Sequence, residues 1–193
     1  MTNKFYDTHA EQFINGTIDI DMSTVYERVE KQIKVGGKIL DVGFGSGRDS
    51  LYFMHRGYSV VSIDNSEEIV NRGQIILHSE VLEVDVREIA YREEFDAVWV
   101  CATMVHLNDQ EFMDVLKRLV DALKPEGIIY ISARYGDFEG DIQGRYMNYV
   151  DEKQLKGALS TMTNVDVVDQ WIDDDLRDDF DDLQWFNVIL RKK

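Results

Sequence analysis

The chain has 193 residues, of which 44% are hydrophobic and 30% charged, and its formal net charge at pH 7 is -16. This composition is that of a globular protein and excludes a disordered or fibrous chain. The negative charge repels nucleic-acid backbones and anionic membranes, so we expect neither as a partner. The chain has no run of about eighteen apolar residues, so we expect no membrane span. It also has no apolar stretch near Met1, so we expect no secretory signal. The lone Cys101 can form no internal disulfide or zinc site, so we expect no metal and a cytoplasmic location.

Short apolar runs alternate with helical patterns along the chain. The runs predicted to be strands before the last quarter of the chain are residues 38–42, 58–63, 81–84, 97–101 and 128–132. Two of them, 97–101 and 128–132, are apolar almost throughout, which is typical of central strands covered on both faces. This alternation predicts a parallel, doubly wound sheet.

Capping patterns mark the starts of two predicted helices. Thr24 and Glu27 have the spacing of a capping box, and the apolar residues that follow recur on one helical face. Asn108 and Glu111 have the same spacing and open a helix that the turn 125–127 ends. The sequence therefore predicts one helix before the first strand and another between the fourth and the fifth.

Two final strands, 165–168 and 186–190, follow with no helical pattern between them, which predicts an antiparallel pair. The predicted fold class is α/β: a three-layer Rossmann-like domain with a seven-stranded, mostly parallel sheet and an antiparallel final strand. We expect residues 1–193 to form a single domain. An aspartate-rich stretch, residues 173–182, lies between the two final strands.

A glycine-rich turn, Asp41–Ser50, follows the first predicted strand and opens a helix. Glycines at this place let the chain turn sharply and let a ligand approach the backbone. A dinucleotide fingerprint needs glycine or alanine three residues after Gly45, where the chain has Arg48, so a nicotinamide or flavin is disfavoured. A phosphate-binding loop needs a Gly-Lys-Ser/Thr ending, which is also missing.

The remaining pattern, acidic-x-Gly-x-Gly-x-Gly, resembles motif I of the class I S-adenosylmethionine-dependent methyltransferases. Asp64 ends the second strand 23 residues after Asp41, where a carboxylate can accept both ribose hydroxyls. Asp85-Val86 after the third strand, the fourth strand 95–100 and the turn 123–127 are also similar to that family. The resemblance covers residues 36–135, and the stretch 43–60 is similar to the small tellurite-resistance-type methyltransferases, with Phe44 in place of their usual cysteine.

The resemblance implies S-adenosylmethionine as cofactor. It implies that Asp85 binds the adenine amino group and that the backbone of Val86 binds the ring. Arg48 either binds the methionyl carboxylate or pairs with Asp49. The residues expected to bind the cofactor are Asp41, Gly43, Gly45, Gly47, Arg48, Asp64, Asn65, Asp85, Val86, Cys101 and Ala102. The resemblance also implies an N-terminal helical lid over residues 1–35, a cofactor-binding core over 36–135 and a substrate-side region with the final strand pair over 136–193.

His106, just past the fourth strand, is the candidate catalytic residue, because a base there could accept a proton from the attacking nucleophile. The alternative is that His106 caps the next helix or packs against Met104. Candidate substrate residues are Tyr6, Arg134 and Tyr146.

We expect transfer of a methyl group from S-adenosylmethionine to a small-molecule nucleophile. The alternative is a non-catalytic S-adenosylmethionine-binding or protein-interaction module that uses its acidic C-terminal surface. The aspartates of 173–182 either favour a cationic or amine acceptor or form an exposed solubilising loop held by apolar residues, among them Leu176 and Phe180.

Overall fold

The structure is a computed structural model, and it describes residues 2–177 and 183–193. Its main sheet has seven strands in the order β3-β2-β1-β4-β5-β9-β8. Strand β9 runs antiparallel to both of its neighbours, and the remaining strand pairs are parallel. The predicted fold class is therefore confirmed. The strand bounds are β1 Lys38–Val42, β2 Ser59–Asp64, β3 Val81–Glu83, β4 Phe95–Cys101, β5 Leu123–Arg134, β8 Val165–Asp174 and β9 Gln184–Lys192.

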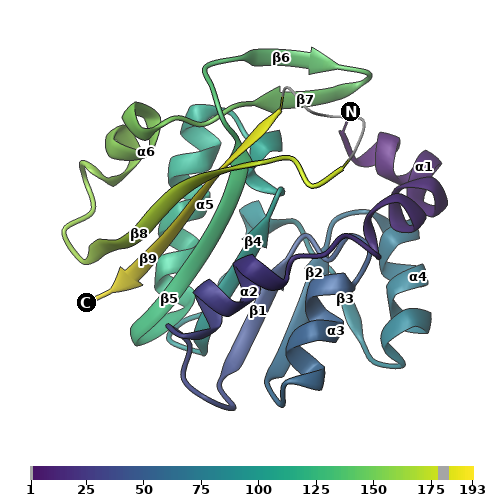
Figure 1. Ribbon diagram of the computed structural model, residues 1–193, viewed down its shortest axis with the longest axis horizontal. Coiled ribbons are helices and arrows are strands. Elements are labelled where there is room, and N and C mark those ends of the chain that lie inside the picture. Colours follow the sequence, from purple (N-terminus) through teal and green to yellow (C-terminus); the bar gives the residue numbers. More distant parts are fainter. Residues whose placement is uncertain (1, 178–182) are drawn as a thin grey trace.

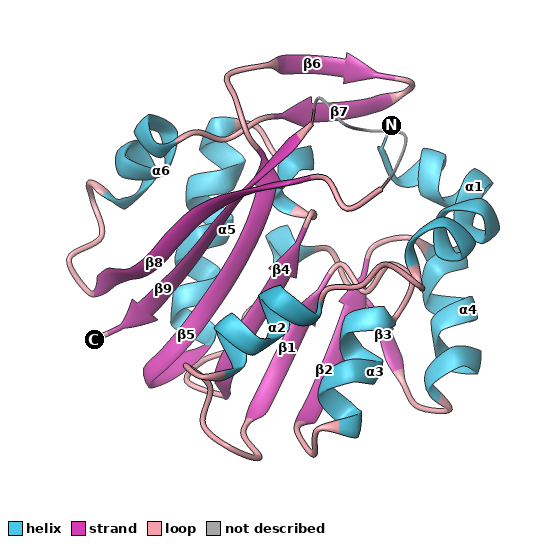
Figure 2. Cartoon of the chain, in the orientation of Figure 1, coloured by secondary structure: helices cyan, strands magenta, loops and turns pink. Residues whose placement is uncertain are grey.

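Helices cover both faces of this sheet (Figures 1 and 2). Helices α2 and α3 lie in front of the sheet in Figure 1, and α5 lies behind it. Helix α1 packs against α4 beside the strands β2 and β3. The helix bounds are α1 Thr2–Thr17, α2 Ser23–Glu30, α3 Arg48–His55, α4 Glu67–Leu77, α5 Asp109–Ala122 and α6 Glu152–Leu159, with short 3-10 helices at η1 Val86–Glu88 and η2 Met104–His106.

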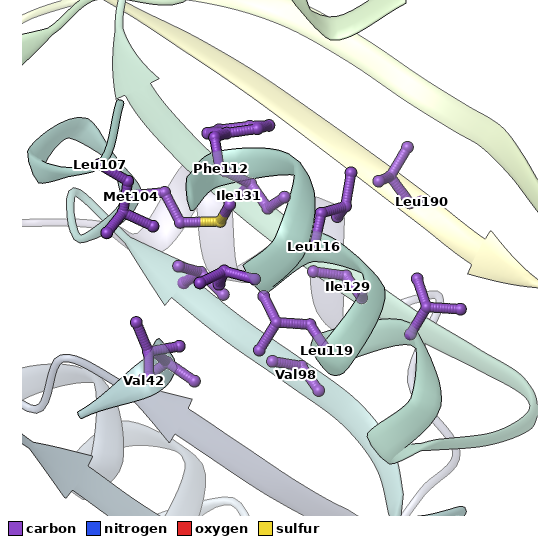
Figure 3. Close-up of a cluster of buried hydrophobic side chains, with 14 of the residues drawn as sticks. Val42, Val98, Met104, Leu107, Phe112, Leu116, Leu119, Ile129, Ile131 and Leu190 are labelled. Carbon is purple, nitrogen blue, oxygen red and sulfur yellow. The ribbon is translucent and has the colours of Figure 1, made fainter. Parts of the chain in front are cut away.

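The core has an apolar layer on each face of the sheet and a further apolar cluster between α1 and α4. Successive residues of a strand point to opposite faces, so Val98 belongs to the layer under α5 and Trp99 to the layer under α2 and α3. Figure 3 shows the α5 layer, in which Phe112, Leu116 and Leu119 lie one helical turn apart and pack on the strands. This spacing fixes α5 on the sheet, and it thereby fixes the end of β4 that reaches the site.

One predicted helix start is wrong and the other is confirmed. Helix α2 begins at Ser23 with Met22 as its N-cap, whose side chain makes no capping hydrogen bond, and the carboxylate of Asp21 accepts a hydrogen bond from the Ser23 amide. Thr24 and Glu27 therefore lie inside the helix and form no capping box. At the start of α5, both hydrogen bonds of the capping box between Asn108 and Glu111 are present.

A β-hairpin and helix α6 have no counterpart among the predicted strands and helices. A hairpin of β6 Glu139–Ile142 and β7 Arg145–Asn148 follows β5, and helix α6 follows the hairpin. The hairpin lies beyond the carboxyl end of β5, at the same end of the sheet as α1 (Figure 1). Within the described part of the chain, no helix combines the length and the apolar composition needed to cross a bilayer.

Candidate functional site

A cavity of about 990 Å³ opens at the carboxyl ends of β1, β2, β4 and β5. This is the edge at which open α/β sheets bind ligands. The glycine-rich turn after β1 forms its floor, and side chains of α1, the β6–β7 hairpin and the ends of β8 and β9 complete its wall. Ligand sites range from about 300 to about 1,000 Å³, so this cavity has room for more than one small ligand.

Two glycines of the turn lie so close to neighbouring side chains that a side chain of their own would collide with them. A Cβ atom on Gly43 would lie 2.0 Å from Oγ1 of Thr103, which donates a hydrogen bond to the carbonyl oxygen of Val42. A Cβ atom on Gly45 would lie 3.2 Å from the ring of Phe13 in α1. Both glycines also have positive φ angles, which L-residues with side chains rarely adopt. The turn therefore presents bare backbone to the cavity.

Two predicted cofactor residues support this turn from outside the cavity lining. The buried carboxylate of Asp41 accepts a 2.5 Å hydrogen bond from the Ser50 hydroxyl, and burial followed by the charge of Asp49 raises its pKa. Gly47 lies under the ring of Phe44, where an added Cβ would come within 2.4 Å of the ring. The expectation that Asp41 and Gly47 contact a cofactor is not supported by their positions, because both positions face packed protein.

Phe44 replaces a smaller residue of the resembled motif, and its side chain is buried between α1 and α4. Its ring contacts the position of Gly73 in the middle of α4, where a Cβ would lie 2.5 Å from the ring. The glycine in this helix therefore makes the space that the larger side chain at position 44 needs.

Asp64 ends β2 and faces the cavity. One carboxylate oxygen accepts a hydrogen bond from the amide of Gly45 at 3.1 Å and the other from the amide of Ser66 at 3.0 Å. Burial raises the pKa of Asp64. Because the Ser66 hydroxyl caps α4, Asp64 is not needed as the helix cap and is available to a ligand. Asn65 lines the cavity beside it.

Asp85 and Val86 line the cavity at the end of β3, but Asp85 already has a partner. Its two oxygens accept hydrogen bonds from the guanidinium of Arg87 at 3.0 and 2.6 Å, and this pairing lowers the pKa of Asp85. Arg87 also pairs with Glu111 of α5. The Asp85 carboxylate is thus held in one orientation at the cavity wall.

Arg48 pairs with Asp49, which is one of the two roles expected for it. Its guanidinium donates to both Asp49 oxygens at 2.7 and 3.1 Å. The same carboxylate accepts hydrogen bonds from Tyr26 at 2.5 Å and from Trp99 at 2.9 Å, so this arginine is held rigidly. Arg48 nevertheless lines the cavity, where it can also meet an anionic ligand group.

Cys101 and Ala102 lie at the end of β4 and line the cavity. Burial raises the pKa of the Cys101 thiol to about 11, so this thiol stays protonated at neutral pH and is no nucleophile there. Ala102 has a φ of 57°, a strained conformation for alanine, and its amide donates to the side chain and the carbonyl group of Ser132. The strand therefore ends in a fixed, sharp turn toward η2.

His106 joins the N-terminal helix to the hairpin. Its Nδ1 atom lies 2.8 Å from the carbonyl oxygen of Tyr146 and must be the donor there, so its Nε2 atom accepts a hydrogen bond from the Tyr6 hydroxyl at 2.9 Å. Burial lowers the pKa of His106, which keeps the ring neutral. The candidate catalytic residue, His106, and one of the three candidate substrate residues, Tyr6, are thus in direct contact. The side chain of Tyr146 is not in the cavity lining, because its hydroxyl donates to Glu139 on the hairpin.

Arg134, the last residue of β5 and a candidate substrate residue, lines the cavity. Its guanidinium stacks on the ring of Trp185 and lies 3.0 Å from a carboxylate oxygen of Asp175. Asp175 is 2% exposed and also pairs with Arg177. Part of the aspartate-rich stretch is therefore folded into the cavity wall; Asp178, Asp179, Phe180, Asp181 and Asp182 lie outside the described residues.

Several residues of the cavity have no signal in the sequence. Phe13, Arg145, Asp175 and Trp185 line it without belonging to any motif, and they come from four different elements or loops. Among the described residues, no cluster of three or more histidine, cysteine or acidic side chains could hold a metal ion.

Helix α1 is attached to the cavity rim by hydrogen bonds near both of its ends. Asn3 donates to the carbonyl oxygen of Asn65, and Asp7 accepts from the hydroxyl of Ser66. At the other end, the carbonyl oxygen of Thr17 accepts from Arg48. The helix therefore lies across the glycine-rich turn and the end of β2, as a cover for this part of the cavity.

The order of the strands, the reversed β9 and the glycine-rich turn after β1 define a Rossmann-like, class I methyltransferase fold. Comparison with known proteins agrees: residues 39–127 match a family model described as a methyltransferase domain. This segment, a little under half of the chain, is thus similar to methyltransferase domains, and the whole chain shares the fold of solved methyltransferases.

Among curated relatives, a putative methyltransferase of Bacillus subtilis is 32% identical over 108 residues, which are 52% of this chain and 44% of that protein. The chain thus spans less than half the length of that relative. A methyltransferase structure from Methanosarcina mazei has a TM-score of 0.76 at 18% identity and covers 86% of this chain and 97% of its own. The 1,6-didemethyltoxoflavin-N1-methyltransferase of Burkholderia thailandensis, solved with its substrate and S-adenosylhomocysteine, has a TM-score of 0.74 at 19% identity, with 98% and 84% covered.

The residues present fit S-adenosylmethionine. The turn has no side chain at positions 43 and 45, where a Cβ would meet Thr103 or Phe13, and the carboxylate of Asp64 lies at the end of β2 without having to cap a helix. The rigid Arg48 guanidinium supplies a cation for the carboxylate of an amino acid group. These three features match the polar groups of a nucleoside joined to an amino acid.

Proposed function

We propose that the chain transfers a methyl group from S-adenosylmethionine to a small-molecule nucleophile. The observation that carries this proposal is one cavity whose lining includes the glycine-rich turn and Asp64 as well as the side chains of Tyr6, His106 and Arg134. When bound, S-adenosylmethionine supplies an electrophilic methyl group on its sulfonium sulfur. The chain then has to align the acceptor and exclude water, and a covered cavity does both.

The cofactor would be held by five groups. We propose that Asp64 accepts the ribose hydroxyls and that Asp85, held by Arg87, accepts from the adenine amino group, with the Val86 backbone beside the ring. The amides of the glycine-rich turn and Arg48 would hold the amino acid part. Asn65, Cys101 and Ala102 complete the surface around it.

The acceptor would be small because side chains of α1 and the β6–β7 hairpin form part of the wall of the cavity. The substrate of the Burkholderia structure is itself a small molecule, which supports the same class here. A net charge of -16 disfavours nucleic acid as the acceptor. In this proposal residues 1–193 act as one domain whose helix α1 is the lid, and the cytoplasmic location stays a prediction.

His106 and Tyr6 would remove the proton of the acceptor. As the nucleophile attacks, its proton passes to the Tyr6 oxygen, and the Tyr6 proton passes to Nε2 of His106. Tyr6 is then again a neutral phenol, and His106 carries the positive charge. The proton on Nδ1 of His106 stays there throughout and is donated in a hydrogen bond to the carbonyl oxygen of Tyr146. His106 thus acts through Tyr6, and Tyr6 is the group that touches the acceptor.

The test uses S-adenosylmethionine with a deuterated methyl group and a cell extract divided by size into small molecules and macromolecules. We expect deuterium in a small-molecule product, none in the macromolecules, and no product with the Asp64→Ala variant. Glu83→Ala is the matched control, since Glu83 is exposed on the neighbouring strand β3. Label in the macromolecules would contradict the substrate class, and cofactor binding without any transfer would establish the non-catalytic alternative.

A further inference from the structure

Arg145, the first residue of β7, is a cation of the cavity wall that no part of the mechanism above uses. Its Nε atom is buried and has no hydrogen-bond partner among the described residues. Its guanidinium carbon lies 4.6 Å from the centre of the Phe5 ring, and its side chain reaches the Tyr6 hydroxyl. The charge of Arg145 therefore lies directly beside the proposed acceptor position.

The other arginines of the cavity differ from Arg145, because each has a carboxylate in contact. Arg48 pairs with Asp49, Arg87 with Asp85, and Arg134 with Asp175. In residues 2–177 and 183–193, no carboxylate lies within ion-pair distance of Arg145. A guanidinium that is partly removed from water is stable only with hydrogen-bond acceptors, and its planar fork of donors matches a carboxylate.

We infer that the methyl acceptor is a carboxylate-bearing small molecule and that Arg145 binds its carboxylate. This inference rests on the proposed function and adds the charge of the substrate to it. The aromatic side chains of Tyr6, Tyr149 and Trp185 also line the cavity, and they favour an acceptor with a planar or aromatic body. The carboxylate would hold such a body with its nucleophilic atom near the Tyr6 hydroxyl.

The aspartates described in the stretch 173–177 argue against a cationic acceptor. Asp173 accepts a hydrogen bond from the indole of Trp171, and Asp174 accepts one from Gln184. Asp175 is enclosed between Arg134 and Arg177. The buried carboxylate of this group, Asp175, is thus already paired with cations of the chain, so no cationic ligand is needed to offset its charge.

Binding of an anion at Arg145 would also assist the proton transfer. The positive charge of Arg145 disfavours a second positive charge on His106. A carboxylate on Arg145 offsets that charge at the moment when the acceptor is present, so the imidazole becomes a better base only in the loaded site. Substrate charge and catalysis are coupled in this way.

The test compares acids with their uncharged isosteres. Benzoate, phenylacetate and 3-phenylpropionate, each beside its primary amide, are titrated calorimetrically into the full chain with and without saturating S-adenosylhomocysteine. We expect at least one acid to bind about tenfold or more tightly than its amide. Arg145→Met should abolish this preference, and Arg145→Lys should keep part of it. Arg92→Met should keep all of it, because Arg92 is an exposed arginine paired with Asp121.

Three results would overturn the inference: equal affinity of every acid and its amide, absence of binding by every acid, or an acid preference that survives in Arg145→Met. A fourth is a loss of S-adenosylhomocysteine affinity in Arg145→Met as large as the loss of acid affinity, because Arg145 would then bind the cofactor's own carboxylate. Failure of S-adenosylhomocysteine to bind the unmodified chain is a different result. It would contradict the proposed function, and the comparison of acids with amides would still be readable.

Discussion

Replacement of Asp64 by alanine is expected to weaken binding of S-adenosylhomocysteine strongly. The carboxylate lies at the end of β2, where each of its oxygens accepts one hydrogen bond from a backbone amide and keeps a further lone pair for a ribose hydroxyl. Alanine removes both carboxylate oxygens that would accept hydrogen bonds from the ribose. Two hydrogen bonds to a charged group, at about 1.5 kcal/mol or more each, amount to about 3 kcal/mol, or roughly 150-fold in Kd.

The structure also predicts what the same substitution does to the fold. It leaves the amides of Gly45 and Ser66 without their acceptor, which costs about 1 kcal/mol for each amide. The cap of α4 remains, because Ser66 provides it. The Asp64→Ala variant should therefore unfold at a lower urea concentration than the unmodified chain but remain folded under binding conditions.

Isothermal titration calorimetry with S-adenosylhomocysteine measures the affinity, and urea unfolding measures the stability. Asp64→Asn is the graded variant: its single carbonyl oxygen can serve only one of the two backbone amides, so its affinity should fall between those of the unmodified chain and Asp64→Ala. Glu83→Ala, on the adjacent strand, should bind normally. An unchanged Kd in a folded Asp64→Ala variant would refute the assignment of Asp64 to the ribose.

Three further predictions concern the lid, the core and the pH dependence. Amide hydrogen exchange of Thr2–Thr17 should slow on addition of S-adenosylhomocysteine, while exchange of Glu152–Leu159 stays unchanged; equal exchange in both segments would contradict the lid. Gly73→Ala should lower the free energy of unfolding, measured with urea, by about 1–3 kcal/mol, because the new Cβ would meet the Phe44 ring. The same substitution should cost less in a chain that already carries Phe44→Ala. Because burial lowers the pKa of His106 in the folded chain, His106 contributes stability above its ordinary pKa of about 6.5 and loses it as the pH falls toward the lowered value. The difference in unfolding free energy between the unmodified chain and His106→Asn should become smaller as the pH falls below about 6.5. A difference that stays constant with pH would contradict this prediction.

The parallel half of the fold could be predicted because its strands carry the signal locally. Residues 97–101 and 128–132 are apolar on both faces, and both lie in the middle of the sheet as β4 and β5. Glycine spacing and the position of Asp64 likewise belong to single segments. The hairpin 139–148 was missed because its strands are polar and interrupted by glycine, so no alternation of apolar residues marks them.

The acceptor end could not be predicted, because its residues meet only through the fold. Asp175 belongs to a run of acidic residues, and nothing local distinguishes it from its neighbours, yet it alone of Asp173, Asp174 and Asp175 pairs with two arginines. Arg145 becomes notable only because β7 brings it to the Tyr6 hydroxyl. His106 and Tyr6 were both singled out by position, but their contact spans 100 residues and depends on how α1 packs.

The most direct test is to measure which cofactor binds at the glycine-rich turn. Calorimetric titrations of the unmodified chain with S-adenosylmethionine, S-adenosylhomocysteine and NAD⁺ compare the cofactor that the site fits with the one that Arg48 disfavours. The account predicts that the two S-adenosyl compounds bind at one site per chain and that NAD⁺ gives no binding heat. Absence of binding by both S-adenosyl compounds to the folded chain, or tighter binding of NAD⁺, would contradict it.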